Sequence, residues 1–178
     1  MAKTKNKVLV TGANGFIALH CILELLNNGY LVKGSIRNLE YADKVRKSFR
    51  KNINIKNLEL CKLDLLKDDG WEEAICDCDY LLHIASPCVI NEPKNENQII
   101  EPAIQGTLRA LKFANQFKIN KVVITSSIGA IAFGSKKRIY DKNDWTDINK
   151  YVGTYIKSKT LAERAAWEFI SQKNPSFS

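Results

Sequence analysis

The chain has little of the material from which metal sites and disulfide frameworks are built. It contains two histidines and an odd number of cysteines, five, with no Cys-x-x-Cys pair. Such a set predicts reduced, mostly buried thiols, and it favours neither a disulfide framework nor a metal site.

Long apolar runs are also missing. No stretch approaches the ~20 apolar residues that a helix needs to span a bilayer. The basic start, with Lys3, Lys5 and Lys7, leads into no small-residue cleavage site. We therefore expect a cytoplasmic protein that holds no metal and has no membrane segment.

Acidic residues are in deficit. Nineteen aspartates and glutamates face 27 lysines and arginines, which leaves a net charge of +8. Much of the excess falls in one segment, at Lys44, Arg46, Lys47, Arg50, Lys51 and Lys56. Surfaces that bind nucleic acid interleave basic and aromatic side chains, and here only Phe49 is aromatic. The segment therefore predicts a solvated basic helix face, of use to a phosphorylated ligand, and no nucleic-acid partner.

Strand-like and helix-like patterns alternate along the 178 residues, which are 45% hydrophobic and enough for one domain with its own core. We expect strands at residues 8–10, 30–36 and 58–62, a fourth that begins at 80 and is stopped by Pro87, and a fifth that begins at 121. We expect helices at residues 20–26, about 40–51, 71–75, 97–117 and 155–169. This alternation predicts an α/β fold, a doubly wound parallel sheet of the Rossmann type with strand order 3-2-1-4-5.

Residues 11–18, which follow the first strand, predict an anion site. Gly12 and Gly15 allow a tight turn and a close approach of a ligand to the backbone, and small Ala18 lets the next helix lie against the sheet. The N-terminus of that helix offers N–H groups and partial positive charge to a pyrophosphate. By itself the pattern also fits an ordinary strand–turn–helix.

The end of the second strand indicates which dinucleotide is bound. An acidic residue there would accept hydrogen bonds from the adenosine ribose and mark NAD, but the chain has Arg37, and Lys44 follows soon after. The planar fork of an arginine suits a 2′-phosphate, so NADP(H) is favoured over NAD(H). The alternative is that Arg37 stacks on the adenine or faces water.

The ends of the third and fourth strands extend this cofactor site. Asp64 and Leu65 follow the third strand, where the adenine pocket lies in such folds, and Ala85 and Ser86 end the fourth strand and line the cofactor. His83 is interpreted as a core histidine with satisfied hydrogen bonds and not as a catalyst.

Tyr155 and Lys159 form the candidate catalytic pair. Their i, i+4 spacing places a phenol and an ammonium on one helix face, one turn apart. A neighbouring positive charge stabilises a phenolate, so such a tyrosine can exchange protons near neutral pH. Ser127 follows the fifth strand and would hold the substrate oxygen by its hydroxyl group. Because Tyr-x-x-x-Lys is frequent by chance, the hypothesis depends on its combination with the glycine loop and the hydroxyl cluster.

Together these segments resemble the amino-terminal half of an extended short-chain dehydrogenase/reductase. The resemblance is to the dihydroflavonol reductase and cinnamoyl-CoA reductase branch of the NAD-dependent epimerase/dehydratase superfamily. The matching segments are VTGANGFI (10–17), HIASP (83–87), PAIQGTL (102–108), VITSS (123–127), DW (144–145) and SKTLAERAAW (158–167). They extend over nearly all of the chain.

The resemblance implies NADPH-dependent reduction of an aldehyde or ketone, a small carbonyl substrate, to an alcohol. Ser127 resembles the catalytic serine, Tyr155 the proton donor, and Lys159 the lysine that assists the tyrosine and binds the nicotinamide ribose. The other cofactor contacts implied are Gly12, Asn14, Gly15, Phe16 and Ile17 for the pyrophosphate, Arg37 and Lys44 for the 2′-phosphate, Asp64 and Leu65 for the adenine, and Ala85, Ser86 and Thr125 toward the nicotinamide.

The chain departs from the family pattern in two ways. Ala132 stands where plant dihydroflavonol reductases commonly have an asparagine that touches the flavonoid, which argues against a flavonoid substrate. The resemblance implies that residues 1–178 correspond to an NAD(P)-binding Rossmann domain that is incomplete at its C-terminus, without the small substrate domain. We therefore expect strand 122–126 to be an exposed edge that promotes dimerisation, segment swapping or poor solubility, and the resemblance allows a homodimer.

Two other functions stay open. One is a non-catalytic NADP-binding fragment, because without a substrate lid the nicotinamide is open to water and the carbonyl is not positioned. The weaker one is a sugar-nucleotide epimerase that uses the same three catalytic residues with tightly held NAD. Arg37, in place of an acid, argues against the epimerase.

Overall fold

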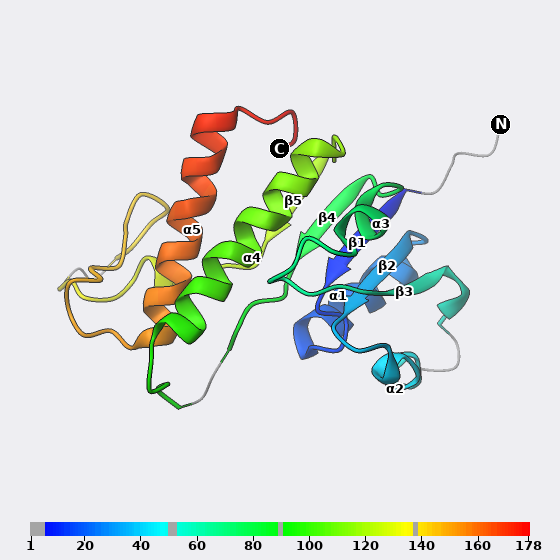
Figure 1. The fold of residues 1–178 in the computed structure, drawn as a ribbon, viewed down its shortest axis with the longest axis horizontal. Helices are drawn as coiled ribbons and strands as arrows, with labels where there is room; N and C mark the ends of the chain where they lie inside the picture. The colour runs from blue at the N-terminus through cyan, green and yellow to red at the C-terminus, as the bar shows by residue number, and fades with distance from the viewer. Residues whose placement is uncertain (1–5, 50–52, 89–90, 137–138) are drawn as a thin grey trace. The chain divides into compact units, whose positions relative to one another are not determined.

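The computed structural model describes residues 6–49, 53–88, 91–136 and 139–178 (Figure 1). The chain divides into two compact units. The first, called here the sheet unit, comprises residues 1–85, 112–125 and 176–178. The second, the helical unit, comprises residues 86–111 and 126–175. Arg50 and Lys51, which end the predicted basic helix, lie outside the described residues.

The sheet unit contains five parallel strands in the order β3-β2-β1-β4-β5, as predicted (Figure 1). They are β1 (Lys7–Thr11), β2 (Leu31–Ile36), β3 (Leu58–Lys62), β4 (Tyr80–His83) and β5 (Lys121–Ile124). Val10 pairs with Gly34 of β2 on one side and with Leu82 of β4 on the other. Because β1 is central and both faces of the sheet are covered, Val8, Leu9 and Val10 are all buried, which explains the unbroken apolar run.

Five α-helices and three 3₁₀ turns complete the described chain. They are α1 (Phe16–Asn27), α2 (Ala42–Lys47), α3 (Trp71–Ile75), α4 (Asn97–Gln116), α5 (Thr154–Lys173), η1 (Leu39–Tyr41), η2 (Ile55–Asn57) and η3 (Ile128–Ala130). Ala18 and Ile22 of α1 pack with Val8 and Val10 in one buried cluster. Pro102 lies in the second turn of α4, where it removes the hydrogen bond to the carbonyl of Gln98, and the helix continues past it. No helix in the described ranges is long and apolar enough to cross a bilayer.

Two predicted elements end earlier than the sequence pattern indicated. The helix expected at 40–51 is the 3₁₀ turn η1 followed by α2, which stops at Lys47. The N–H of Ser48 is shared between the carbonyls of Lys44 and Val45, and its hydroxyl donates to Lys44 at 2.9 Å, so the last turn tightens and closes. The fourth strand stops at His83 and not at Pro87, for a reason that belongs to the candidate site.

Two surface expectations are also revised. The cysteines are free thiols but not mostly buried: Cys76 and Cys88 are exposed, and the other three are half-buried. The edge strand β5 is partly paired, because the N–H of Val122 donates to the carbonyl of Ser178 at 3.0 Å. Dimerisation stays a prediction.

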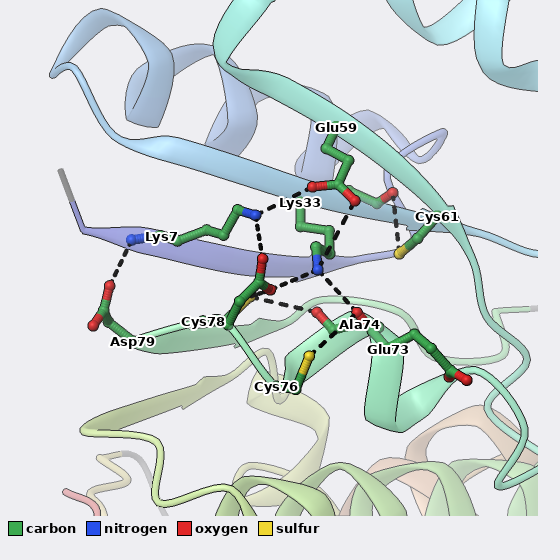
Figure 2. Close-up of polar contacts among 11 residues, drawn as sticks. Lys7, Lys33, Glu59, Cys61, Glu73, Ala74, Cys76, Cys78 and Asp79 are labelled. Carbon is green, nitrogen blue, oxygen red and sulfur yellow. Dashed lines mark hydrogen bonds and ion pairs between the residues drawn. The ribbon is translucent and has the colours of Figure 1, made fainter. Parts of the chain in front are cut away.

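A cluster of four charged residues joins three strands of the sheet unit (Figure 2). Lys33 of β2, only 4% exposed, donates to Asp77 Oδ1 at 2.6 Å and to the carbonyl of Glu73 at 2.9 Å. Lys7 of β1 donates to Asp77 Oδ2 at 2.5 Å and to Glu59 of β3 at 3.2 Å. Asp77 thus links β1 and β2 to the turn that precedes β4, and it neutralises a buried ammonium.

These contacts determine the protonation states around the cluster. Burial alone would raise the pKa of Asp77, but hydrogen bonds from Lys33 and Lys7 outweigh it and lower the pKa to about 2. The pKa of Lys33 is raised, because the bond to Asp77 outweighs the effect of burial. Burial raises the pKa of Cys61 to about 11 and that of Cys78 to about 12. Both thiols are therefore protonated at neutral pH and poor nucleophiles.

Replacing Asp77 should destabilise the fold in a pH-dependent way. Asp77→Asn leaves the Lys33 ammonium buried with weaker partners, so we expect the free energy of unfolding at pH 7 to fall by about 1–3 kcal/mol. Since the folded-state pKa is depressed, the contribution of Asp77 is complete above about pH 4 and is lost as the pH falls toward 2. Urea unfolding of both proteins across this range measures the difference.

Asp68→Asn is the matched control, because Asp68 pairs with Lys112 at 2.9 Å while both side chains are about half exposed. We expect it to cost at most about 0.5 kcal/mol, as exposed ion pairs do. An equal loss in both variants, or a loss for Asp77→Asn that does not change with pH, would contradict the role given to the cluster.

Candidate active site

The loop between β1 and α1 requires glycine at one position for two reasons. Gly12 has φ of +73°, and a Cβ there would lie 2.9 Å from the Cβ of Ala85. Gly15 differs, because its φ of −83° suits any residue, and a Cβ there would lie 3.2 Å from the carbonyl oxygen of Gly12. Gly12 is thus required by its backbone conformation and by packing against Ala85. Gly15 is favoured only because a Cβ there would crowd the carbonyl of Gly12.

The N-terminus of α1 is open. Its N-cap is Gly15, which has no side chain to accept a hydrogen bond, and its first turn holds no acidic residue. The Gly15 N–H donates to the Gly12 carbonyl, and the first backbone bond into the helix runs from Leu19 N–H to the Gly15 carbonyl, so the N–H groups of residues 16–18 have no acceptor within the helix. Phe16 and Ile17 are 78% and 53% exposed, whereas Ala18 is fully buried against the sheet as predicted. These features fit the pyrophosphate of a dinucleotide.

The hydroxyl group of Thr11 holds the ends of β1 and β4 together. It accepts hydrogen bonds from the N–H groups of Ile84 and Ala85, both at 3.0 Å, and β4 therefore ends at His83. Its oxygen also lies 3.1 Å from His83 Nδ1, within hydrogen-bond distance. His83 is 3% exposed, in agreement with the prediction of a core histidine. Strand order reverses between β1 and β4, the usual position of a ligand crevice.

The predicted adenosine contacts lie at the same edge of the sheet. Arg37 follows β2 directly and is exposed, and Lys44 is exposed on α2. The N–H of Leu63 donates to the carbonyl of Ile36 at 3.0 Å, so Arg37 and Asp64 each follow a paired residue at the carboxyl ends of neighbouring strands. Asp64 also accepts the N–H of Leu66 at 3.0 Å and forms a turn, and Leu65 is half-buried between them.

In the helical unit, Ser127 caps the 3₁₀ turn η3. Its Oγ accepts the N–H of Gly129 at 3.1 Å, which leaves the hydroxyl hydrogen to donate elsewhere. The turn packs on the start of α5, because a Cβ on Gly129 would lie 3.2 Å from Ile156 and the Gly129 carbonyl accepts from Thr160 at 3.4 Å. The loop that carries Ser127 is therefore held against the helix that carries Tyr155.

Tyr155 and Lys159 lie on α5 with the predicted spacing. Tyr155 is in the first turn and is half-buried, and Lys159 follows one turn later and is 7% exposed. Burial lowers the pKa of Lys159 below its ordinary value, although Cys88 and Glu163 act in the opposite direction. An ammonium in such a place has little water to solvate it and interacts strongly with nearby polar groups.

Glu163 is a functional candidate to which sequence reasoning assigned no role. Its carboxylate accepts a hydrogen bond from Ser126 and another from Trp167 Nε1 at 3.4 Å. It thereby joins the residue before Ser127 to the helix of Tyr155 and Lys159. The signal was available, because Tyr155, Lys159 and Glu163 continue one helix face at spacings of four residues.

The predicted site residues fall into two groups. The sheet unit holds the glycine loop with Asn14, the adenosine contacts, Ala85 and Thr125, whose N–H donates to the His83 carbonyl at 3.0 Å. The helical unit holds Ser86, Ser127, Tyr155 and Lys159. Among the described residues no group of three or more His, Cys, Asp or Glu is arranged to hold a metal ion.

Several known proteins with similar sequences or structures are named as reductases. The chain is 35% identical to dihydroflavonol 4-reductase of Arabidopsis thaliana over 99% of its own length and 48% of the relative's. It is 34% identical to cinnamoyl-CoA reductase CAD2 of Medicago truncatula over 95% of its own length and 54% of that protein. Yeast methylglyoxal/isovaleraldehyde reductase Gre2, solved as a complex with NADPH, has a TM-score of 0.81 and 28% identity, over 96% of this chain and 55% of that one.

The chain thus spans about half the length of the curated relatives it matches. The expected strand order, glycine loop and Tyr-x-x-x-Lys helix are all present in its structure. The sequence profile of the 3-beta hydroxysteroid dehydrogenase/isomerase family matches residues 9–171, nearly the entire chain. The chain therefore belongs to the 3-beta hydroxysteroid dehydrogenase/isomerase family, with dihydroflavonol and cinnamoyl-CoA reductases among its relatives.

Proposed function

We propose that the chain is the NADP-binding part of an oxidoreductase that reduces an aldehyde or ketone to an alcohol, with Tyr155 as the proton donor. The observation that carries the proposal is the helical unit itself. There η3 and Glu163 hold the Ser127 loop against the helix that carries Tyr155 and the buried Lys159. The relatives are named as reductases, which supports the same reaction class, and one of them was solved with NADPH.

The sheet unit supplies the cofactor contacts in this proposal. The glycine loop and the open N-terminus of α1 would hold the pyrophosphate, Arg37 and Lys44 the 2′-phosphate, and Asp64 and Leu65 the adenine. Ala85 and Thr125 of this unit, and Ser86 of the helical unit, would lie toward the nicotinamide. NADPH, when bound, supplies the hydride for the carbonyl carbon.

In this proposal, residues of the helical unit bind the substrate oxygen and transfer a proton to it. The Ser127 hydroxyl, whose hydrogen is not used by Gly129, donates a hydrogen bond to the carbonyl oxygen and fixes its position. As that oxygen gains negative charge, the Tyr155 hydroxyl transfers its proton to it and the alcohol is formed. The Lys159 ammonium, one turn away, stabilises the negative charge left on the phenol oxygen.

Part of the carbonyl site would come from residues outside these 178. Because the chain spans about half of its relatives, we propose that the small substrate domain implied by the resemblance, which these 178 residues do not include, adds the remaining wall of the carbonyl site. The 178 residues would then bind NADPH by themselves, and turnover would depend on how well they position a carbonyl.

Replacing Gly12 should remove cofactor binding. Gly12→Ala places a Cβ against Ala85 and strains a backbone with φ of +73°, so we expect NADPH affinity to fall at least ~10-fold when measured by calorimetry. Gly29→Ala is the matched control, because Gly29 has φ of +80° but open space around a Cβ. Both variants carry backbone strain, and only the first should lose NADPH. Unchanged binding in Gly12→Ala would reject the loop as the pyrophosphate site.

Arg37 should discriminate between the two nicotinamide cofactors. Arg37→Ala removes a charge-assisted contact to the 2′-phosphate, so NADPH affinity should fall by about 10- to 100-fold while NADH affinity changes little. Lys47→Ala, which removes an exposed charge from α2, is the control for general electrostatics and should have a small effect. Equal losses of NADPH and NADH in Arg37→Ala would indicate that Arg37 stacks on the adenine.

Tyr155 should be needed for turnover and not for cofactor binding. Tyr155→Phe removes the proton donor, so NADPH oxidation with a panel of aldehydes and ketones should slow by about 10²–10⁴-fold. Tyr151→Phe, at a position that is 91% exposed, should keep wild-type rates. Turnover that survives in Tyr155→Phe would overturn the assigned mechanism, and NADPH binding without any wild-type turnover would favour the non-catalytic alternative.

A further inference from the structure

The helix that carries Tyr155 begins at a residue that cannot cap it. Its N-cap is Gly153, with φ of 84° and ψ of 148°, and this residue has no side chain to accept the first N–H groups. Thr154, the first helical residue, is 7% exposed, so an unpaired N–H or hydroxyl there would be costly. The helix therefore needs an acceptor from another part of the chain.

Glu92, 62 residues earlier in the chain, supplies that acceptor. Its Oε1 accepts the N–H of Thr154 at 3.0 Å, and its Oε2 accepts the Thr154 hydroxyl at 2.5 Å. The carboxylate also places a negative charge at the positive end of a 20-residue helix. One side chain thus performs the tasks of an N-cap residue and of a first-turn acid.

Gly153 explains how a remote carboxylate can reach this position. A Cβ on residue 153 would lie 3.0 Å from Glu92 Oε1, closer than nearly all side-chain contacts allow. That oxygen ends a flexible side chain, so the stronger requirement for glycine is the backbone, whose φ of 84° and ψ of 148° disfavour other residues. Gly153 thus leads into α5 without a side chain beside the carboxylate of Glu92.

A second carboxylate from the same segment serves as an internal comparison. Glu96 accepts from Lys157 Nζ at 2.8 Å and 3.0 Å, so it also bridges to the start of α5. Glu96 reaches the end of a flexible lysine side chain, whereas Glu92 binds the backbone and the buried hydroxyl of the residue before Tyr155. Only Glu92 can fix the path of the first turn.

We propose that Glu92 is a positioning residue for Tyr155: a remote N-cap that fixes the first turn of α5 and with it the phenol. Its catalytic meaning rests on the proposed function, because a proton donor has to meet the substrate oxygen within a narrow range of positions. Glu92 also makes that position depend on residues 91–96, the segment that follows the predicted nicotinamide contacts. The start of α5 and this segment then form one structural element of the active site.

The test compares Glu92→Ala, Glu92→Gln and the control Glu96→Ala in the 178-residue chain. Hydrogen exchange of peptides that cover residues 151–160 reports on the first turn, and steady-state kinetics with NADPH and an aldehyde report on Tyr155. Glu92→Ala should speed amide exchange in this segment by about 5- to 30-fold, the range that the loss of a cap predicts. It should lower kcat by a similar factor and leave the KM for NADPH unchanged.

Glu92→Gln keeps an acceptor oxygen for the Thr154 N–H and should restore most of the protection and of the rate, whereas Glu96→Ala should change neither. Unchanged exchange in Glu92→Ala, or a loss of the same size in Glu96→Ala, would overturn the cap. Faster exchange with a wild-type kcat would overturn the positioning role. Absence of turnover in the wild-type chain would instead count against the proposed function, and the exchange measurement would still decide whether Glu92 caps α5.

Discussion

The contact between the β1–α1 loop and the end of β4 is the constraint on which the sheet unit depends. Thr11 takes the N–H groups of Ile84 and Ala85 that a longer strand would use in its ladder, so β4 ends beside the loop. Gly12 then passes so close to Ala85 that a Cβ cannot fit between them. These two residues end β4, begin the turn into α1 and leave the N-terminus of that helix open at the point where strand order reverses.

Much of the fold could be predicted from local sequence because burial determined it. The run at residues 8–10 is apolar throughout because β1 is central in the sheet and its side chains on both faces are buried, and the order of strands and helices is that of a parallel α/β sheet. The ends of elements were harder to predict. β4 stops at His83 because of a threonine 72 residues away, and α2 stops at Lys47 because Ser48 bonds back onto it. The hydrophobic pattern of the sequence does not reveal either of these contacts.

The residues of the candidate site also divide into those that local sequence predicts and those that distant contacts reveal. Tyr155 and Lys159 could be found because helix geometry converts a spacing of four residues into a shared face, and Ser127 because it follows a strand. Glu163 has the same spacing, but its importance comes from its bond to Ser126, which folding alone brings within reach. Glu92 gave no signal in the sequence, because it lies 62 residues before Thr154 and only folding brings it to the start of α5. Sequence patterns therefore predicted which groups react, and the structure shows which contacts hold those groups in place.

Two buried lysines show why these supporting groups matter. Lys33 and Lys159 are about equally buried, at 4% and 7% exposure, yet burial and neighbours move their pKa values in opposite directions. The carboxylate of Asp77 lies 2.6 Å from the Lys33 ammonium, and its negative charge more than offsets the cost of burying that ammonium. This suits the role of Lys33 in joining strands. Glu163 raises the pKa of Lys159 while its carboxylate already accepts hydrogen bonds from Ser126 and Trp167, and burial, which lowers that pKa, remains the larger effect.

A buried ammonium whose desolvation is only partly offset interacts strongly with any polar group brought beside it. On α5 the residue one turn before Lys159 is Tyr155. The two lysines thus differ in the balance between burial and neighbouring charge: the charge of Asp77 outweighs burial at Lys33, whereas burial outweighs the charges near Lys159.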